Sequence, residues 1–195
     1  MTTSLTLKQP LLWIDCEMTG LNLSKDRIIE VAAMLTDGSL SRTVEGPSLI
    51  IHQPKDLLDS MDEWCTQHHG QSGLTASVLA SKLSTAQAED QLIAFLRAHT
   101  SSQDRVVLAG NSVHVDRQFL QQEMPRLMGM LHYRILDVST IKEVVGRWYT
   151  KEEVSPPKKG MSHRAMDDIL ESIEELKYYR STVFRPSGTL SPKKD

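Results

Sequence analysis

The sequence has few cysteines, few aromatic residues and no excess of basic charge. Its 195 residues include two cysteines, Cys16 and Cys65, and neither belongs to a Cys-x-x-Cys pair. We therefore expect no disulfide framework and no structural zinc site, but free thiols in a reducing compartment. The sequence has 22 basic and 25 acidic residues, which gives a formal net charge of -3. A long basic groove for a polyanion is not the default expectation for such a chain.

Long apolar runs are absent as well. No stretch is long and apolar enough to span a membrane, and residues 1–10 lack both an arginine and the apolar core of a signal peptide. We expect a cytoplasmic protein without membrane contact, and a mitochondrial fraction made by trimming a longer precursor is compatible with this. The composition, 39% hydrophobic and 24% charged, fits one globular domain over residues 1–184. The tail 185–195 is rich in Pro, Ser and Lys, which predicts disorder.

Short apolar segments predict five strands. The first three are joined by short turns, one of them at Asp37-Gly38, and this predicts an antiparallel meander. A capping-box pattern at Ser84 is followed by apolar residues at helical spacing, which predicts a helix. A later predicted helix is interrupted at Pro125. Either Ser139 or Thr140 is the expected N-cap of the helix after the fifth strand. The predicted strands cover residues 11–14, 27–36, 49–51, 105–109 and 133–138, and the clearest helix covers 162–180. This order predicts an α/β fold with a mixed five-stranded sheet flanked by helices.

Two carboxylates stand at the end of the first apolar run. Side chains alternate along a strand, so Asp15 and Glu17 point to one side and Cys16 to the other. Two carboxylates that face the same way repel each other and resist desolvation, and a divalent cation between them removes both problems. Hard oxygen ligands suit Mg²⁺ or Mn²⁺. Taken alone, however, Asp-x-Glu is a common triplet and more often a solvated start of a loop.

Two further acidic groups stand where helices begin. Asp116 lies in the first turn after Gly110-Asn111-Ser112, and His163 precedes Asp167 and Asp168. A ligand set of carboxylates without cysteine favours hard cations. Two such ions ~3.5–4 Å apart would clamp the attacking and the leaving oxygen of a phosphoryl displacement. A histidine here is placed to take a proton from water. The alternatives are a solvated histidine and a favourable charge near a helix N-terminus. Helical spacing brings His163 closer to Asp167, so the residues alone leave open which aspartate takes part.

The polar segment 56–73 contains an unexpected tryptophan. Trp64 there either caps the edge of the core or stacks on a base. The adjacent His68 and His69 suggest zinc, but no third soft ligand stands at the spacing of a structural site.

Several motifs occur together in one order, and they carry a resemblance. The pattern of Asp15-x-Glu17, then Asn111-Ser112 with Asp116, then His163 with Asp168 resembles that of the DEDDh 3′→5′ exonucleases. A closer likeness is to the oligoribonuclease family, most of all to its eukaryotic members, and it extends from Leu11 to Arg180. The segments that carry it are 13–21, 62–64, 69–70, 110–114, 132–134, 137–140 and 162–165.

The resemblance implies a ribonuclease H-like exonuclease fold and an active homodimer. It implies that two Mg²⁺ or Mn²⁺ ions bind at each active site, with His163 as general base. The implied metal ligands are Asp15, Glu17, Asp116 and Asp168. The implied substrate contacts are Leu21 as a wedge between two bases, Trp64, His69, Ser112 and Ser139, with the partner's Tyr133 and the partner's Arg134. One departure is Cys16, where a leucine is more usual, but its side chain should point away from the metals.

The sequence therefore predicts a 3′→5′ exoribonuclease that degrades very short RNA, especially dinucleotides, to nucleoside 5′-monophosphates. The slightly acidic charge agrees, because a dinucleotide offers few phosphates. One alternative is a related exonuclease that trims longer RNA or DNA, which would call for a basic groove. Another is an inactive nucleic-acid-binding module, which would have lost a ligand, whereas every carboxylate of the pattern is present.

Overall fold

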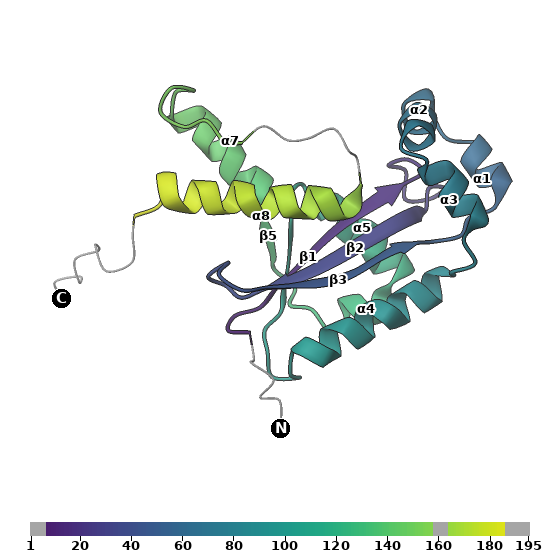
Figure 1. The fold of residues 1–195 in the computed structure, drawn as a ribbon, viewed down its shortest axis with the longest axis horizontal. Helices are drawn as coiled ribbons and strands as arrows, with labels where there is room; N and C mark the ends of the chain where they lie inside the picture. The colour runs from purple at the N-terminus through teal and green to yellow at the C-terminus, as the bar shows by residue number, and fades with distance from the viewer. Residues whose placement is uncertain (1–6, 158–163, 186–195) are drawn as a thin grey trace.

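The sheet lies at the centre of the molecule. A computed structural model describes residues 7–157 and 164–185 (Figure 1). One five-stranded sheet has the order β3-β2-β1-β4-β5. The first three strands pair antiparallel, whereas β4 runs parallel to both β1 and β5. The strands are β1 (Leu11–Met18), β2 (Ile28–Thr36), β3 (Thr43–Ile50), β4 (Val107–Gly110) and β5 (Ile135–Asp137). The predicted mixed five-stranded α/β fold is confirmed.

Helices cover both faces of this sheet (Figure 1). The helices α4, α5 and α6 pack on one face, and α7 and α8 pack on the other. The short helices α1 to α3 gather beyond the end toward which the β1 arrow points (Figure 1). The helices are α1 (Lys55–Asp59), α2 (Glu63–Gln71), α3 (Leu74–Ala80), α4 (Thr85–His99), α5 (His114–Glu123), α6 (Pro125–Met128), α7 (Val138–Trp148) and α8 (Ala165–Thr182). Within the described residues, none of these helices is long and apolar enough to cross a membrane.

The two faces of β1 have different partners. Leu12, Ile14 and Cys16 belong to the core on the α4–α6 side. Leu11 and Trp13 belong to the core beneath α8. Since side chains alternate along a strand, the odd-numbered residues that follow Trp13 also face α8. The strand is therefore buried on both faces, and its two carboxylates are directed toward the helix that carries Asp168.

The structure corrects the predicted start of the third strand. β3 begins at Thr43, six residues before Leu49, and it runs through Pro47. Proline fits because β3 is an edge strand, where one side of the backbone is not needed for pairing. The glycine before it fits because a Cβ on Gly46 would lie 2.5 Å from the Ala33 carbonyl oxygen and 2.7 Å from the Phe95 ring. Edge position and close packing are tertiary features, and a local pattern does not contain them.

A second correction concerns the start of α7. The N-cap is Asp137 and not Ser139 or Thr140, because the Asp137 side chain accepts a hydrogen bond of 3.0 Å from the Ser139 amide. The Ser139 hydroxyl is thereby left for other contacts. The other local signals behave as expected: Ser84 forms its capping box with Gln87, and a helix break occurs before Pro125. Of the predicted tail, residues 186–195 lie outside the described residues.

Candidate active site at the end of the first strand

Three carboxylates meet where β1 ends. Asp15 and Glu17 come from the strand, and Asp168 comes from the first turn of α8. One oxygen of each lies within 4.8 Å of the others, and this is the one group with metal-binding geometry among residues 7–157 and 164–185. Asp167 is exposed and does not belong to the group. The structure thus places Asp168 at the position for which helical spacing alone leaned toward Asp167.

Asp116 approaches the same strand from the other side of the sheet. It is buried in the first turn of α5, and its Oδ1 accepts a hydrogen bond of 2.9 Å from the Cys16 amide, between the two strand carboxylates. Asp116 is not one of the three carboxylates that meet within 4.8 Å. Burial raises the pKa of Asp116 to about 6, although the Cys16 amide favours the charged form. Four acidic side chains therefore lie at the end of β1: two from the strand itself, one from α5 and one from α8.

The electrostatics of this cluster favour a bound cation. Burial, followed by the charges of Asp168 and Glu30, raises the pKa of Glu17 to about 8. Bringing carboxylates together out of water penalises their ionised forms, and a divalent ion removes that penalty. The donor set of the cluster consists of carboxylate oxygens alone, which fits Mg²⁺ or Mn²⁺ and does not fit a thiolate-ligated metal.

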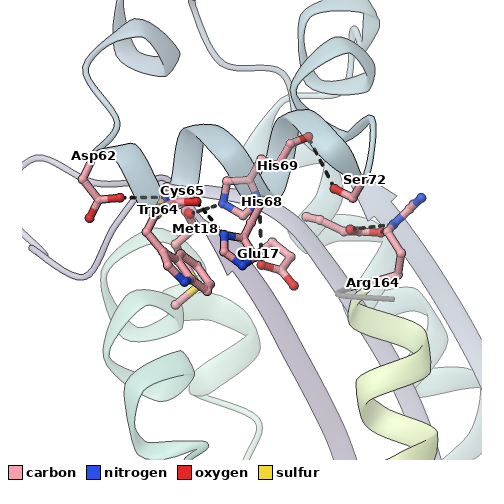
Figure 2. A network of polar contacts seen from close by, with 10 residues as sticks. Glu17, Met18, Asp62, Trp64, Cys65, His68, His69, Ser72 and Arg164 are labelled. Atoms are coloured by element: carbon pink, nitrogen blue, oxygen red, sulfur yellow. Dashed lines mark hydrogen bonds and ion pairs between the residues drawn. The ribbon is translucent and has the colours of Figure 1, made fainter. Parts of the chain in front are cut away.

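An ion pair between a half-exposed arginine and a buried glutamate connects the start of α8 to the sheet. Glu30 lies opposite Glu17 in the β1–β2 register and is almost fully buried. The guanidinium of Arg164, the residue before α8, donates from Nη2 to Glu30 Oε1 at 3.0 Å (Figure 2). Sequence reasoning missed this pair. Its one sequence signal is a glutamate in an otherwise apolar strand.

A cavity of ≈ 500 Å³ opens beside the cluster. Its lining includes Leu21, Trp64, Glu17, Cys65 and His69. The side chains of Leu21 and Trp64 are 75% and 56% exposed. The structure places Trp64 in the first turn of α2, which Asp62 caps, and not in a loop. The Trp64 ring stacks on His68 with ring centroids 3.9 Å apart (Figure 2). Two exposed apolar side chains and the carboxylates of Glu17 and Asp62 thus line one cavity.

His69 supports the wall of this cavity. It is buried, and its Nε2 donates a hydrogen bond of 2.9 Å to the carbonyl of Met18, the last residue of β1 (Figure 2). Burial lowers the pKa of His69, so its imidazole stays neutral near pH 7. With Nε2 protonated, Nδ1 is the free nitrogen of the neutral ring, and it lies 4.0 Å from Glu17 Oε2. The structure therefore places His69 beside Glu17 and in the lining of the cavity, and its role as a substrate contact stays a prediction.

The two predicted serines meet at the ends of β4 and β5. Their hydroxyl oxygens are 3.1 Å apart, and the Ser112 amide donates to Asp137 Oδ1 and to Ser139 Oγ, each at 2.9 Å. Ser112 has a φ of 50°, which turns its amide toward these acceptors. His114 Nδ1 lies 3.3 Å from the other oxygen of Asp137. The two serines and Asp137 therefore form one polar group that includes a carboxylate.

Asn111 connects this polar group to α8. Its Oδ1 accepts from the Ser139 hydroxyl at 3.1 Å, and its Nδ2 donates to Ser172 Oγ at 2.8 Å and to Glu175 Oε2 at 3.1 Å. Ser172 in turn donates to the Asp168 carbonyl at 2.7 Å. Asn111 belongs to one of the sequence motifs, but the sequence predicted no role for it. Its two partners on α8 lie more than sixty residues away in the chain, and no local signal marks them.

Tyr133 and Arg134 lie away from the cluster of their own chain. Tyr133 is 65% exposed, and its hydroxyl accepts from Arg134 Nε at 3.1 Å. Both precede β5, and the pairings across β4 place Ile135 level with Leu12 of β1. At about 3.3 Å per residue, that level is roughly 10 Å behind Asp15 along the sheet. The predicted base, His163, lies outside the described residues.

Comparisons with known proteins agree with this geometry. Residues 12–176 match the family model of the RNase T type, described as exonuclease. The chain is 52% identical over 180 residues to the mitochondrial oligoribonuclease of Homo sapiens, which covers 92% of this chain and 76% of the relative. It is 51% identical over 178 residues to the oligoribonuclease of Arabidopsis thaliana, with 91% and 80% covered.

A solved structure supports the fold in particular. Exonuclease I of E. coli in complex with a dA16 oligonucleotide superposes with a TM-score of 0.67 at 14% identity, over 90% of this chain and 41% of that one. The chain thus spans less than half the length of that enzyme, and the likeness shows the ribonuclease H-like exonuclease fold. Together with the sequence matches, it places the chain in the exonuclease family and, within that family, among the oligoribonucleases.

Proposed function

We propose that the chain is a 3′→5′ exoribonuclease that degrades very short RNA, especially dinucleotides, to nucleoside 5′-monophosphates. The observation that carries this proposal is the joining of two features at one place. The carboxylates of Asp15, Glu17 and Asp168 meet within 4.8 Å, and Glu17 also lines the cavity that contains Leu21 and Trp64. A centre for phosphodiester hydrolysis thus borders a short apolar hollow that suits a few bases.

The family and the carboxylate cluster together indicate the use of divalent metal ions. The further proposal is that two Mg²⁺ or Mn²⁺ ions bind at each site. When bound, they would stabilise the charge on the attacking and leaving oxygens of a phosphoryl displacement. The residues proposed to hold them are Asp15, Glu17, Asp116 and Asp168. His163 is proposed to accept the proton of the attacking water, a role that suits an imidazole because its pKa is near neutral.

The cavity residues are proposed to bind the two bases. Leu21 would insert between them and Trp64 would pack against one of them, which gives affinity with little sequence discrimination. His68 already covers one face of the Trp64 ring, so a base would use the remaining exposed surface. His69 would act beside them through the strand end that it holds.

The polar group of Ser112, Ser139 and Asp137 is proposed to form the pocket for the 5′ phosphate. Its carboxylate, Asp137, would repel an anion, so additional positive charge is needed there. The proposed source is the partner's Arg134, aligned by the partner's Tyr133, in a homodimer. The exposure of this pair and its position behind the cluster of its own chain support a role in the neighbouring site.

The charge of the chain and its thiols support the remaining parts of the proposal. A net charge of -3 is compatible with a substrate that carries few phosphates. Both cysteines are buried and free, which supports a reducing compartment such as the cytoplasm. Cell fractionation would test the location, and the human relative is named as mitochondrial.

The test is incubation with 5′-labelled RNAs of two to ten nucleotides, with Mg²⁺ and with a chelator. We expect complete conversion of the dinucleotide to mononucleotides, slower loss of longer RNAs and no reaction in chelator. A rate that rises with length would instead favour an exonuclease for longer RNA or DNA. Binding without hydrolysis would favour an inactive binding module.

A further inference from the structure

The loop between β1 and β2 carries Leu21, and both of its ends are fixed. The Thr19 amide donates to the Arg27 carbonyl at 3.0 Å, and the Arg27 amide donates to the Thr19 hydroxyl oxygen at 3.1 Å. Thr19 itself is buried, whereas Leu21 is 75% exposed. An exposed apolar side chain therefore stands on a loop whose base is closed by reciprocal hydrogen bonds.

A buried carboxylate fills the interior of this loop. Asp26 is 4% exposed; its Oδ1 accepts from the Thr19 hydroxyl at 3.0 Å, and its Oδ2 accepts from the Asn22 amide at 2.8 Å. A Cβ on Gly20 would lie 2.5 Å from Asp26 Oδ2, so the chain wraps closely around the carboxylate. Both neighbours of Leu21 in the sequence, Gly20 and Asn22, thus touch Asp26.

The last turn of α5 fixes this loop relative to the acidic cluster. Gln122 Nε2 donates to the Leu23 carbonyl at 3.0 Å, and Glu123 Oε1 accepts from the Ile28 amide at 3.1 Å. The first turn of the same helix carries Asp116. One helix therefore sets the place of both Leu21 and a proposed metal ligand.

We propose that Asp26 is a positioning residue that determines specificity, because it holds Leu21 as a preformed wedge facing the cavity beside Trp64. This inference rests on the proposed role of Leu21 between two bases. A side chain that is ordered before binding loses no freedom when the substrate arrives, so more of the contact energy appears as affinity. Without Asp26 the loop would have to be ordered by the dinucleotide itself.

The experiment uses steady-state kinetics of the full chain with a 5′-phosphorylated diadenosine ribonucleotide and Mg²⁺. Asp26→Asn keeps the size of the side chain but sets an NH₂ group against one of its two donors, Thr19 and Asn22. We expect KM to rise about three- to tenfold with kcat nearly unchanged, which is the scale of ordering one or two side chains. Leu21→Ala should raise KM at least as much, and the double variant should match Leu21→Ala alone.

A mononucleotide separates the wedge from general damage to the site. AMP has one base and nothing for Leu21 to separate, so its inhibition constant should stay within about twofold in Asp26→Asn. A loss of AMP affinity equal to the loss for the dinucleotide would overturn the inference. So would effects of Asp26→Asn and Leu21→Ala on KM that simply multiply in the double variant.

The chain offers a matched control in the β2–β3 turn. Asp37 also organises a turn, by accepting from the amides of Ser41 and Arg42 at 2.9 and 3.1 Å. Asp37→Asn should lower the melting temperature and leave KM unchanged. An equal rise in KM would mean that any loss of stability produces the effect, and the inference would be wrong.

A milder variant keeps the test decisive if Asp26→Asn does not fold. Thr19→Val keeps the shape of the side chain and removes the hydroxyl that donates to Asp26 Oδ1 and accepts from the Arg27 amide. We expect it to raise KM about two- to threefold, again without effect on AMP. If Leu21→Ala leaves KM unchanged, the wedge of the proposed function fails. If only the Asp26 and Thr19 variants leave KM unchanged, the wedge stands and the positioning role is wrong.

Discussion

The acidic cluster and the proposed serine pocket, formed by Ser112, Ser139 and Asp137, differ in what one chain supplies for the proposed reaction. Asp15, Glu17 and Asp168 meet without help from another chain. The serine pocket instead has its amide donors occupied by Asp137 and holds a carboxylate where an anion is proposed to bind. Under the proposed function a cation from elsewhere is needed there, whereas the acidic cluster needs only metal ions.

The acidic cluster is therefore expected to determine hydrolysis itself, and the serine pocket to determine which substrate length is preferred. Damage to the cluster should stop hydrolysis of every substrate alike. Damage to the pocket, or to the surface that completes it, should change which lengths are preferred. The two regions are nevertheless connected, because Asn111 bonds to Ser139 on one side and to Ser172 of the Asp168 helix on the other.

The largest expected effect is that of Asp15→Asn. The variant keeps the shape and removes charge that holds the metal, so turnover should fall about a thousandfold on all lengths, the scale of several kcal/mol. In metal-free buffer its melting temperature should be unchanged or higher, because a repulsion is removed. Asp56→Asn, an exposed aspartate on α1, is the control. Near wild-type turnover of Asp15→Asn would rule out its role as a ligand.

The next effect distinguishes two neighbouring aspartates. Asp168→Ala removes a member of the cluster and should reduce turnover at least a hundredfold, whereas Asp167→Ala removes an exposed charge and should stay within about threefold. Turnover of the two variants is compared side by side at saturating Mg²⁺. The reverse ranking would mean that Asp167 is the residue that serves the metal.

A mixed dimer tests the division between the two regions directly. A chain with Asp15→Asn and a chain with Arg134→Ala should each be nearly inactive as homodimers on the dinucleotide. After mixing and refolding, half of the dimers are mixed and each has one intact site, so activity should recover to about a quarter of wild type. No recovery, with mixed dimers demonstrated, would mean that each chain acts alone.

Length preference should change by a smaller factor. A bidentate arginine contact with a terminal phosphate is strong and strict in geometry, and a longer RNA presents a further nucleotide at that position. Wild type should therefore cleave a phosphorylated dinucleotide much faster than a heptamer, and Arg134→Ala should reduce that ratio about tenfold by slowing the dinucleotide most. Single-turnover rates on two, three, five and seven nucleotides provide the measurement, and an unchanged ratio would contradict the capped pocket.

Local patterns in the sequence were sufficient for much of the fold. The short apolar run into Asp15 predicted the strand, and the alternation of side chains along a strand predicted the common direction of Asp15 and Glu17. The capping box at Ser84 and the break at Pro125 depend on residues within one turn, and they too were predicted.

Contacts between distant segments were not predictable in the same way. Glu30 and Arg164 are 134 positions apart, and their pairing depends on where α8 crosses the sheet. The choice of Asp168 over Asp167 depends on the direction from which the helix approaches β1, and helical spacing relative to His163 does not contain that direction. The early start of β3 depends on Phe95 packing against Gly46, a contact with another layer of the fold.

The smallest expected effect is a pH dependence of stability in the metal-free protein. Burial raises the pKa of Glu17 to about 8, above its ordinary value near 4.5. For an acid whose pKa is raised on folding, the stabilising contribution is complete below the unfolded pKa and is lost as pH rises through the folded pKa. In chelator, the melting temperature should therefore decline between about pH 5 and 8 by several degrees. Added Mg²⁺ should restore more stability at pH 8 than at pH 5.5, because it binds the ionised carboxylates. Glu17→Gln should remove most of this decline, and Glu152→Gln, at an exposed glutamate, should not. A decline that persists in Glu17→Gln would place the cause at another group, whereas its loss would identify the buried Glu17 carboxylate as the cause of the pH dependence.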